Sequence, residues 1–258
     1  AQGFTCVHLA LGKLIPGFKM SDAPALLTDE LAAQVRAELD KNGQTCVLLG
    51  CYLNLCSPDM EDHQKTVEIY KAHLRFAKKI GALLVGTETG APNTTYSTCP
   101  ECFTEEALQL FIERVTPVVR YAEEIGQLFA IEPVIRHIVS TPERCERVLK
   151  AVNSPNLRII LDAVNLLTPE NHLRRDEIIS DALHRFGDRI RILHMKDYTV
   201  VDSQSDVKAS ACGTGLMDYT RLLTFAKAHP GLPMTLENTI PANAVAAREH
   251  LEQLALRL

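Results

Sequence analysis

Seven short apolar runs, separated by longer amphipathic stretches, limit what this chain can fold into more than any other feature of its sequence. They are rich in β-branched residues and almost unbroken in hydrophobicity, which is typical of parallel strands covered on both faces. The runs occupy residues 4–11, 45–55, 82–88, 128–133, 157–162, 190–197 and 234–238. Such regular alternation predicts βαβ units built around a parallel sheet. We therefore expect an α/β fold.

The stretches between these runs carry the signals of helix ends. Thr28 precedes an acidic first turn, which is typical of a helix start. Two long helices are predicted over residues 61–81 and 104–126, each closing at a glycine. Thr141 and Pro142 form an N-cap and first-position pair, and they predict the start of a fourth helix.

Length and composition favour one domain over residues 1–258. A chain of 258 residues that is 46% hydrophobic can bury one sizeable core, and no linker divides it. The net charge of −5, without a basic stripe, argues against a nucleic-acid partner. No apolar run approaches the roughly 18 residues of a membrane span. Because the chain opens without a charged-then-apolar leader and several cysteines lie inside apolar runs, we expect a reduced, cytoplasmic protein.

The last four apolar runs end in side chains that can bind a metal. These side chains are Glu132, Asp162, His194 and Glu237. A (β/α)₈ barrel of about 250 residues uses roughly 31 residues per unit, and its active site lies at the carboxyl ends of the strands. Each candidate follows the previous one by about one unit, with a longer interval before Glu237 because a polar loop over residues 198–215 is placed to cross the barrel mouth. The spacing predicts a TIM barrel with four converging side chains.

Each of the four residues also has a purely structural interpretation. Glu132 or Asp162 could cap the following helix, Glu237 could pair with an arginine, and His194 could be a core histidine. Their occurrence together at matching strand ends favours a shared site. Three converging carboxylates would repel one another unless a cation compensated them. Two glutamates, one aspartate and one histidine form an oxygen-rich set that suits six-coordinate Mn²⁺, Mg²⁺ or Co²⁺, with two positions left for a bidentate substrate.

Several short motifs resemble the sugar phosphate isomerase/epimerase family, the xylose isomerase-like TIM barrels. The motifs are IEPV, LD with Asn165 three residues on, HMKD, GTGLMDY, LEN, and GTETG at residues 86–90. The resemblance implies that Glu132, Asp162, His194 and Glu237 bind one divalent metal, most often Mn²⁺, with Mg²⁺, Co²⁺ or Zn²⁺ as alternatives. In ketose 3-epimerases of this group the two glutamates also exchange the substrate proton.

The chain departs from the pattern of this family in two respects. In the family the four ligands lie on the fifth to eighth strands, whereas only three apolar runs precede residues 128–133 here. We therefore expect the first strand and helix of the barrel to be absent from this chain. Ketose 3-epimerases usually carry a histidine at the place of Asn165 and an arginine shortly after the histidine ligand, so a free-hexulose 3-epimerase is disfavoured. Endonuclease IV needs additional histidines and a basic surface, and it fits poorly.

The predicted function is a metal-dependent sugar isomerase or epimerase. An α-hydroxy-carbonyl substrate would bind the metal through adjacent oxygens, and the metal would stabilise an enediolate. Glu132 and Glu237 would face opposite sides of the substrate, one removing the proton and the other returning it. The expected partner is a small sugar or polyol, and a homo-oligomer stays open. The alternatives are a dehydratase of the inosose or dehydroshikimate type and a non-catalytic sugar-binding barrel.

Five further residues are candidates for supporting roles. Lys196, His137 and Asn165 are placed to bind substrate hydroxyl or carbonyl groups, although Lys196 also fits a solvated loop charge. Glu88 ends the run at 82–88 and is expected to line the barrel mouth, with helix capping as the alternative. Asp197 is expected to orient a metal ligand or a lysine without binding the metal itself.

Overall fold

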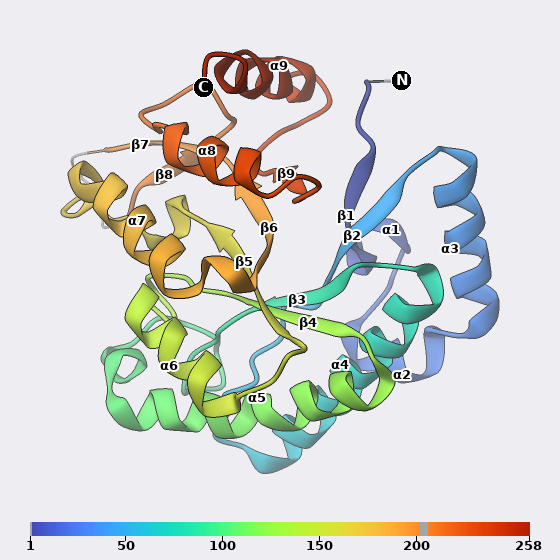
Figure 1. Ribbon diagram of the computed structural model, residues 1–258. Coiled ribbons are helices and arrows are strands. Elements are labelled where there is room, and N and C mark those ends of the chain that lie inside the picture. The colour runs from blue at the N-terminus through green and yellow to red at the C-terminus, as the bar shows by residue number, and fades with distance from the viewer. Residues whose placement is uncertain (1, 202–205) are drawn as a thin grey trace.

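The computed structural model describes residues 2–201 and 206–258. At its centre, seven parallel strands form one sheet that curls into a nearly closed barrel, with helices packed around the outside (Figure 1). The strands follow chain order: β1 (Cys6–Ala10), β2 (Thr45–Gly50), β3 (Leu84–Glu88), β4 (Leu128–Glu132), β5 (Leu157–Asp162), β6 (Ile190–Met195) and β9 (Met234–Leu236). Each predicted apolar run supplies one of these strands. The predicted α/β class and TIM-barrel architecture are confirmed.

The four predicted helices are also confirmed. The helices are α1 (Leu11–Leu14), α2 (Ala23–Leu26), α3 (Asp29–Lys41), α4 (Met60–Ile80), α5 (Glu105–Ile125), α6 (Pro142–Val152), α7 (Arg175–Phe186), α8 (Thr220–Ala228) and α9 (Ala244–Ala255). Short 3₁₀ turns are η1 (Met20–Asp22), η2 (Pro100–Phe103), η3 (Val164–Leu166), η4 (His172–Arg174) and η5 (Gly187–Arg189). Gly81 and Gly126 end α4 and α5 in the left-handed conformation, at φ values of 72° and 67°. No helix in the described ranges has the length and apolar character needed to cross a membrane.

The start of α5 offers a direct test of helix capping. The Thr104 hydroxyl accepts a hydrogen bond from the Ala107 amide over 3.2 Å. In Thr104→Ala this amide loses its partner, so we expect the free energy of unfolding to fall by about 1 kcal/mol. Urea denaturation measures the change. The exposed Thr98→Ala is the matched control, with an expected change below about 0.5 kcal/mol; equal losses in both variants would contradict the capping role.

The inward faces of the strands form a packed layer inside the barrel. Its buried members include Leu48, Leu84, Ala130, Ile160 and Ile192, one from each of the five central strands. Because side chains alternate along a strand, the next inward position lies two residues further on, at the carboxyl end. On β4, β5 and β6 that position is occupied by Glu132, Asp162 and His194. The same alternation that builds the core therefore directs these polar groups into the barrel mouth.

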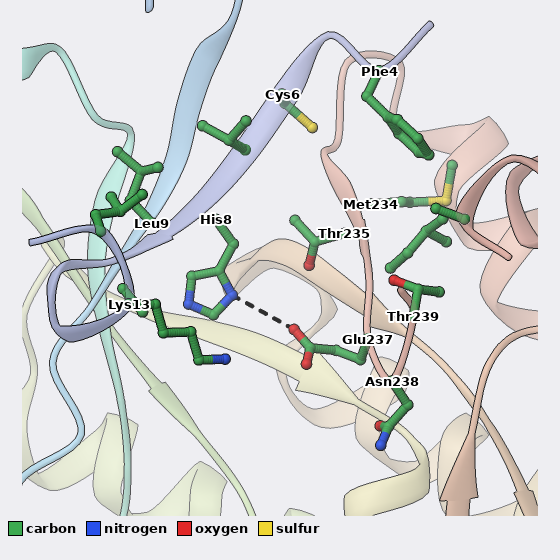
Figure 2. Close-up of a pocket in the computed structure, with 15 residues that line it drawn as sticks. Phe4, Cys6, His8, Leu9, Lys13, Met234, Thr235, Glu237, Asn238 and Thr239 are labelled. Carbon is green, nitrogen blue, oxygen red and sulfur yellow. Dashed lines mark ion pairs between the residues drawn. The ribbon is translucent and has the colours of Figure 1, made fainter. Parts of the chain in front are cut away.

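The barrel is open along one seam. In the described residues the sheet ends at β1 and β9, with no hydrogen-bonded ladder between them. Figure 1 shows these two strands, in blue and orange-red, on either side of the opening. A groove of about 730 Å³ runs along the seam, lined among others by Phe4, His8, Lys13, Met234 and Glu237 (Figure 2). The site at the barrel mouth is thus accessible from this side as well.

Two segments differ from the sequence prediction. The polar loop over residues 198–215 contains an antiparallel ribbon of β7 (Asp197–Thr199) and β8 (Lys208–Ser210), which no periodicity indicated; its residues 202–205 lie outside the described ranges. The apolar run at 45–55 leaves the sheet after Gly50. It does so because the Tyr70 hydroxyl accepts from the amide of Leu53 and donates to its carbonyl, at 3.1 and 2.9 Å. A buried side chain from α4 thus takes the place of a strand partner.

Candidate metal centre at the barrel mouth

Three of the four predicted metal ligands lie together at the ends of adjacent strands. Glu132 and Asp162 are the last residues of β4 and β5, and His194 is the last but one of β6. All three are buried, and one ligand atom from each lies within 4.8 Å of the others. Nδ1 of His194 is 3.3 Å from Oε2 of Glu132. This spacing suits a shared metal ion.

The fourth predicted ligand, Glu237, lies on the other side of the same histidine. Its Oε1 atom is 3.9 Å from Nε2 of His194 and 3.5 Å from Nδ1 of His8. Glu237, His194 and His8 form a second group with ligand atoms within 4.8 Å of one another. Sequence reasoning missed His8. One feature of the sequence could have identified it. His8 is a polar residue inside an apolar strand, and it shares a face of that strand with Cys6, two residues earlier, which packs against the interior layer.

A buried lysine connects the carboxylates of the first group. Nζ of Lys196 lies 2.7 Å from Oδ2 of Asp162 and donates to Oδ1 of Asn165 over 2.6 Å. The Asn165 amide donates in turn to Oε1 of Glu132 over 2.6 Å. Lys196 is buried, so the alternative of a solvated loop charge is wrong. Both Asn165 and Lys196 therefore lie beside the candidate ligands, within reach of anything bound to them.

The polar atoms of Asp162 and His194 differ in how fully they are paired. Oδ1 of Asp162 accepts from the amides of Val164 and Asn165, at 3.0 and 3.2 Å. Its Oδ2 atom is ion-paired with the Lys196 ammonium at 2.7 Å, whereas Nε2 of His194 has no hydrogen-bond partner in the described residues. An unsatisfied buried polar atom costs about 1–3 kcal/mol. A bound cation would satisfy such atoms, so the residues present fit a divalent metal.

The buried ionisable groups of this site shift one another's pKa values. Burial acts to raise the pKa of Glu132, but the charges of His194 and Lys196 lower it overall. Burial raises the pKa of Asp162 in spite of Lys196. Burial acts to lower the pKa of His194, yet Glu132, Asp162 and Glu237 together raise it to about 9. His194 therefore carries a proton that a divalent cation can replace, since metal ligands must be deprotonated.

Glu88 and His137 form a neighbouring polar cluster. Glu88 ends β3 and pairs in register with Glu132, which places it at the barrel mouth as predicted. Its Oε2 atom is 3.7 Å from Nδ1 of His137 and accepts from the Tyr96 hydroxyl over 3.5 Å. Burial and the Glu132 charge raise the pKa of Glu88 to about 7. Burial lowers the pKa of His137 to about 4. Tyr96, which sequence reasoning missed, stacks on His137 with ring centroids 5.2 Å apart.

Asp197 organises the loop that follows β6. Its carboxylate accepts from the amides of Tyr198, Gly213 and Met217, over 2.8, 3.1 and 2.8 Å. Its hydrogen-bond partners in the described ranges are these backbone amides, not a ligand side chain or lysine as expected. Gly215 allows the close packing, because a Cβ there would lie 2.1 Å from the Tyr198 carbonyl oxygen. The GTG sequence at residues 213–215 thus allows the loop to pack closely around Asp197.

Comparison with known proteins agrees with this architecture. A family model described as a xylose isomerase-like TIM barrel matches residues 1–255. Comparison with curated proteins finds no match. The solved structure of IolI protein with a binding zinc atom is 16% identical, with a TM-score of 0.72 over 98% of this chain and 88% of that chain.

Two further solved structures are similar in fold. The probable 3-DHS dehydratase AsbF from Bacillus anthracis is 13% identical, with a TM-score of 0.72 over 100% of this chain and 90% of that chain. The 3-keto-D-glucoside 4-epimerase YcjR from E. coli is 18% identical, with a TM-score of 0.65 over 90% of this chain and 86% of that chain. Such identities show a common fold alone, whereas the family model spans nearly the whole sequence. This chain belongs to the xylose isomerase-like TIM barrel family.

Proposed function

We propose that this protein is a divalent-metal-dependent enzyme that moves a proton next to the carbonyl group of a sugar or sugar derivative. One observation carries the proposal. Glu132, Asp162 and His194 are buried together at the carboxyl ends of three adjacent strands, and Nε2 of His194 has no hydrogen-bond partner in the described residues. In TIM-barrel enzymes this end of the barrel holds the active site.

The metal would be held by Glu132, Asp162 and His194. Glu237, predicted as the fourth ligand, faces the other ring nitrogen of His194. When bound, it supplies a Lewis acid that polarises the substrate carbonyl. The oxygen-rich set favours Mn²⁺, with Mg²⁺ or Co²⁺ as alternatives. Zn²⁺ is a further alternative, and the zinc atom of the similar IolI structure supports a divalent metal in this fold.

The two glutamates are proposed to transfer the proton. Glu132 and Glu237 lie at different ring nitrogens of His194, so both carboxylates border the barrel mouth where a substrate would bind. Asn165 holds Oε1 of Glu132 and so fixes the orientation of the carboxylate that would accept the proton. Lys196 and His137 would donate hydrogen bonds to substrate oxygens, and Glu88 would line the mouth beside them.

A dehydratase is the second candidate, supported by the similarity to AsbF. Removal of the same proton, followed by loss of a hydroxyl from the next carbon, converts a proton transfer into an elimination. Product analysis separates the two reactions, because an elimination releases water and leaves a conjugated carbonyl that absorbs in the ultraviolet. A non-catalytic sugar-binding barrel would produce neither change.

Metal binding is the first test of the proposed centre. After chelator treatment, Mn²⁺ at about 100 times its dissociation constant is expected to stabilise the protein by about 2.7 kcal/mol. Asp162→Asn is expected to lose this gain, because it removes a ligand charge from the buried group. Thermal unfolding and metal analysis measure both effects. Asp188→Asn, at an exposed carboxylate, is the matched control and should keep the full gain. Absence of binding in the wild type would contradict the proposal.

Solvent exchange tests the chemistry. The Mn²⁺-loaded protein is incubated in D₂O with a panel of ketoses, aldoses and keto-polyols, and deuterium at the carbon next to the carbonyl is followed by NMR. We expect incorporation with one class of these compounds and none after removal of the metal. If a metal-loaded protein catalysed neither exchange nor water loss on any of them, while binding one, the sugar-binding barrel would replace the proposed enzyme.

A further inference from the structure

His8 and Glu237 face each other across the groove between β1 and β9, and Figure 2 shows the contact between them. Nδ1 of His8 is 3.5 Å from Oε1 of Glu237, which in turn is 3.9 Å from Nε2 of His194. The two imidazole rings are stacked, with centroids 5.7 Å apart and planes inclined by 16°. Metal bonds of about 2.0–2.2 Å place ligand atoms roughly 3–4 Å apart. The three residues therefore have the spacing of a metal-binding group.

A buried nitrogen without a hydrogen bond points into this group. Nε2 of His194 has no hydrogen-bond partner among the described residues, and the side chain is 3% exposed. Its neighbour there is the Glu237 carboxylate, at a distance too long for a hydrogen bond. An imidazole nitrogen in this position needs either a proton shared with a carboxylate or a cation.

The other nitrogen of His8 is held as in a metal-binding histidine. Nε2 of His8 lies 3.1 Å from the Tyr52 hydroxyl. Metal-bound histidines almost always form a hydrogen bond through the nitrogen that does not bind the metal. Gly50 leaves room for this pair, because a Cβ there would lie 2.5 Å from the Tyr52 ring and 2.9 Å from Nε2 of His8. The contact holds the ring so that Nδ1 faces Glu237.

We infer that His8, Glu237 and Nε2 of His194 form a second cation position that prefers Zn²⁺. The inference rests on the proposed metal-dependent function and adds a position that the four-ligand set does not contain. Two imidazole nitrogens and one carboxylate, with an open fourth position, are typical of catalytic zinc sites. The groove along the seam gives a ligand access to that open position.

His194 links the two positions and makes them alternatives. Its Nδ1 faces Glu132 and its Nε2 faces Glu237. A neutral imidazole has one lone pair for a metal, so His194 serves one cation at a time. The oxygen-rich side with Glu132 and Asp162 suits Mn²⁺, and the nitrogen-rich side with His8 suits Zn²⁺. The kind of metal bound thus decides on which side of His194 the cation lies.

Affinity measurements on matched variants test this arrangement. Dissociation constants for Zn²⁺ and Mn²⁺ are determined by chelator competition, and Co²⁺ absorption reports the coordination geometry. We expect His8→Ala to weaken Zn²⁺ binding at least about 10-fold and to leave Mn²⁺ binding within about twofold, with Asp162→Asn showing the reverse pattern. His184→Ala, at an exposed histidine of α7, is the control. Tyr52→Phe keeps His8 but removes its hydrogen bond, and should weaken Zn²⁺ about 10-fold.

The possible results separate this inference from the proposed function. If His8→Ala and Tyr52→Phe leave both Zn²⁺ affinity and the Co²⁺ spectrum unchanged while Asp162→Asn weakens Mn²⁺, the second position is wrong and the first stands. If wild-type protein binds neither metal, the proposed metal-dependent function fails together with the inference. Circular dichroism and melting temperature establish whether each variant is folded. If His8→Ala does not fold, Tyr52→Phe still tests the second position.

Discussion

Glutamine in place of Glu132 is expected to lower the rate of substrate proton exchange by about 10²–10⁴-fold, the usual contribution of a positioned general acid or base. Glutamine has nearly the shape of glutamate, but its amide cannot accept a proton as a carboxylate does. Asp162 and His194 remain to hold the metal, so exchange is measured at saturating Mn²⁺ with metal content determined in the same samples. The rate of deuterium incorporation by NMR gives the effect.

The matched control for this variant is Glu61→Gln, which removes a carboxylate that is 76% exposed on α4. It should retain the full exchange rate and the metal. A Glu132→Gln protein that keeps its metal and exchanges at the wild-type rate would exclude Glu132 as the proton-transfer group. If the rate is lost together with the metal even at saturating Mn²⁺, Glu132 acts as a ligand and Glu237 becomes the candidate base.

Truncation of Leu48 to alanine is expected to reduce the free energy of unfolding by about 2–5 kcal/mol. Leu48 is fully buried in the layer inside the barrel. The layer is tight, because a Cβ on Gly86 would lie 2.5 Å from methyl carbons of both Leu48 and Ile160. Strands that are hydrogen-bonded on both sides cannot move inward to fill the space, so the cavity stays open.

Leu173→Ala provides the same chemical change at a side chain that is 82% exposed. Urea denaturation of both variants should give a large loss for Leu48→Ala and a change within about 0.5 kcal/mol for Leu173→Ala. A loss below about 1 kcal/mol for Leu48→Ala would mean that the interior layer is loosely packed. In that case the strand ends above it could not position the metal ligands rigidly.

The sequence predicted the sheet well because the evidence for it is local. Each strand is a short apolar run, and the helices begin at capping residues such as Thr104 and Thr141, whose hydroxyls accept backbone hydrogen bonds. The ribbon of β7 and β8 was not predicted, because residues 197–199 and 208–210 gain their strand character from pairing with each other. Local periodicity does not record such a pairing.

The candidate site, too, was predicted from the sequence only in part. The sequence by itself determined that Glu132, Asp162 and His194 lie at neighbouring strand ends, since alternation along each strand places polar groups two residues beyond the core layer. Only the tertiary structure decided that His8 meets Glu237 and that Lys196 is buried against Asp162. Those contacts depend on how the curled sheet brings its first and last strands together and on how the loop after β6 packs. Both are properties of the whole barrel, in which residues far apart in the chain become neighbours.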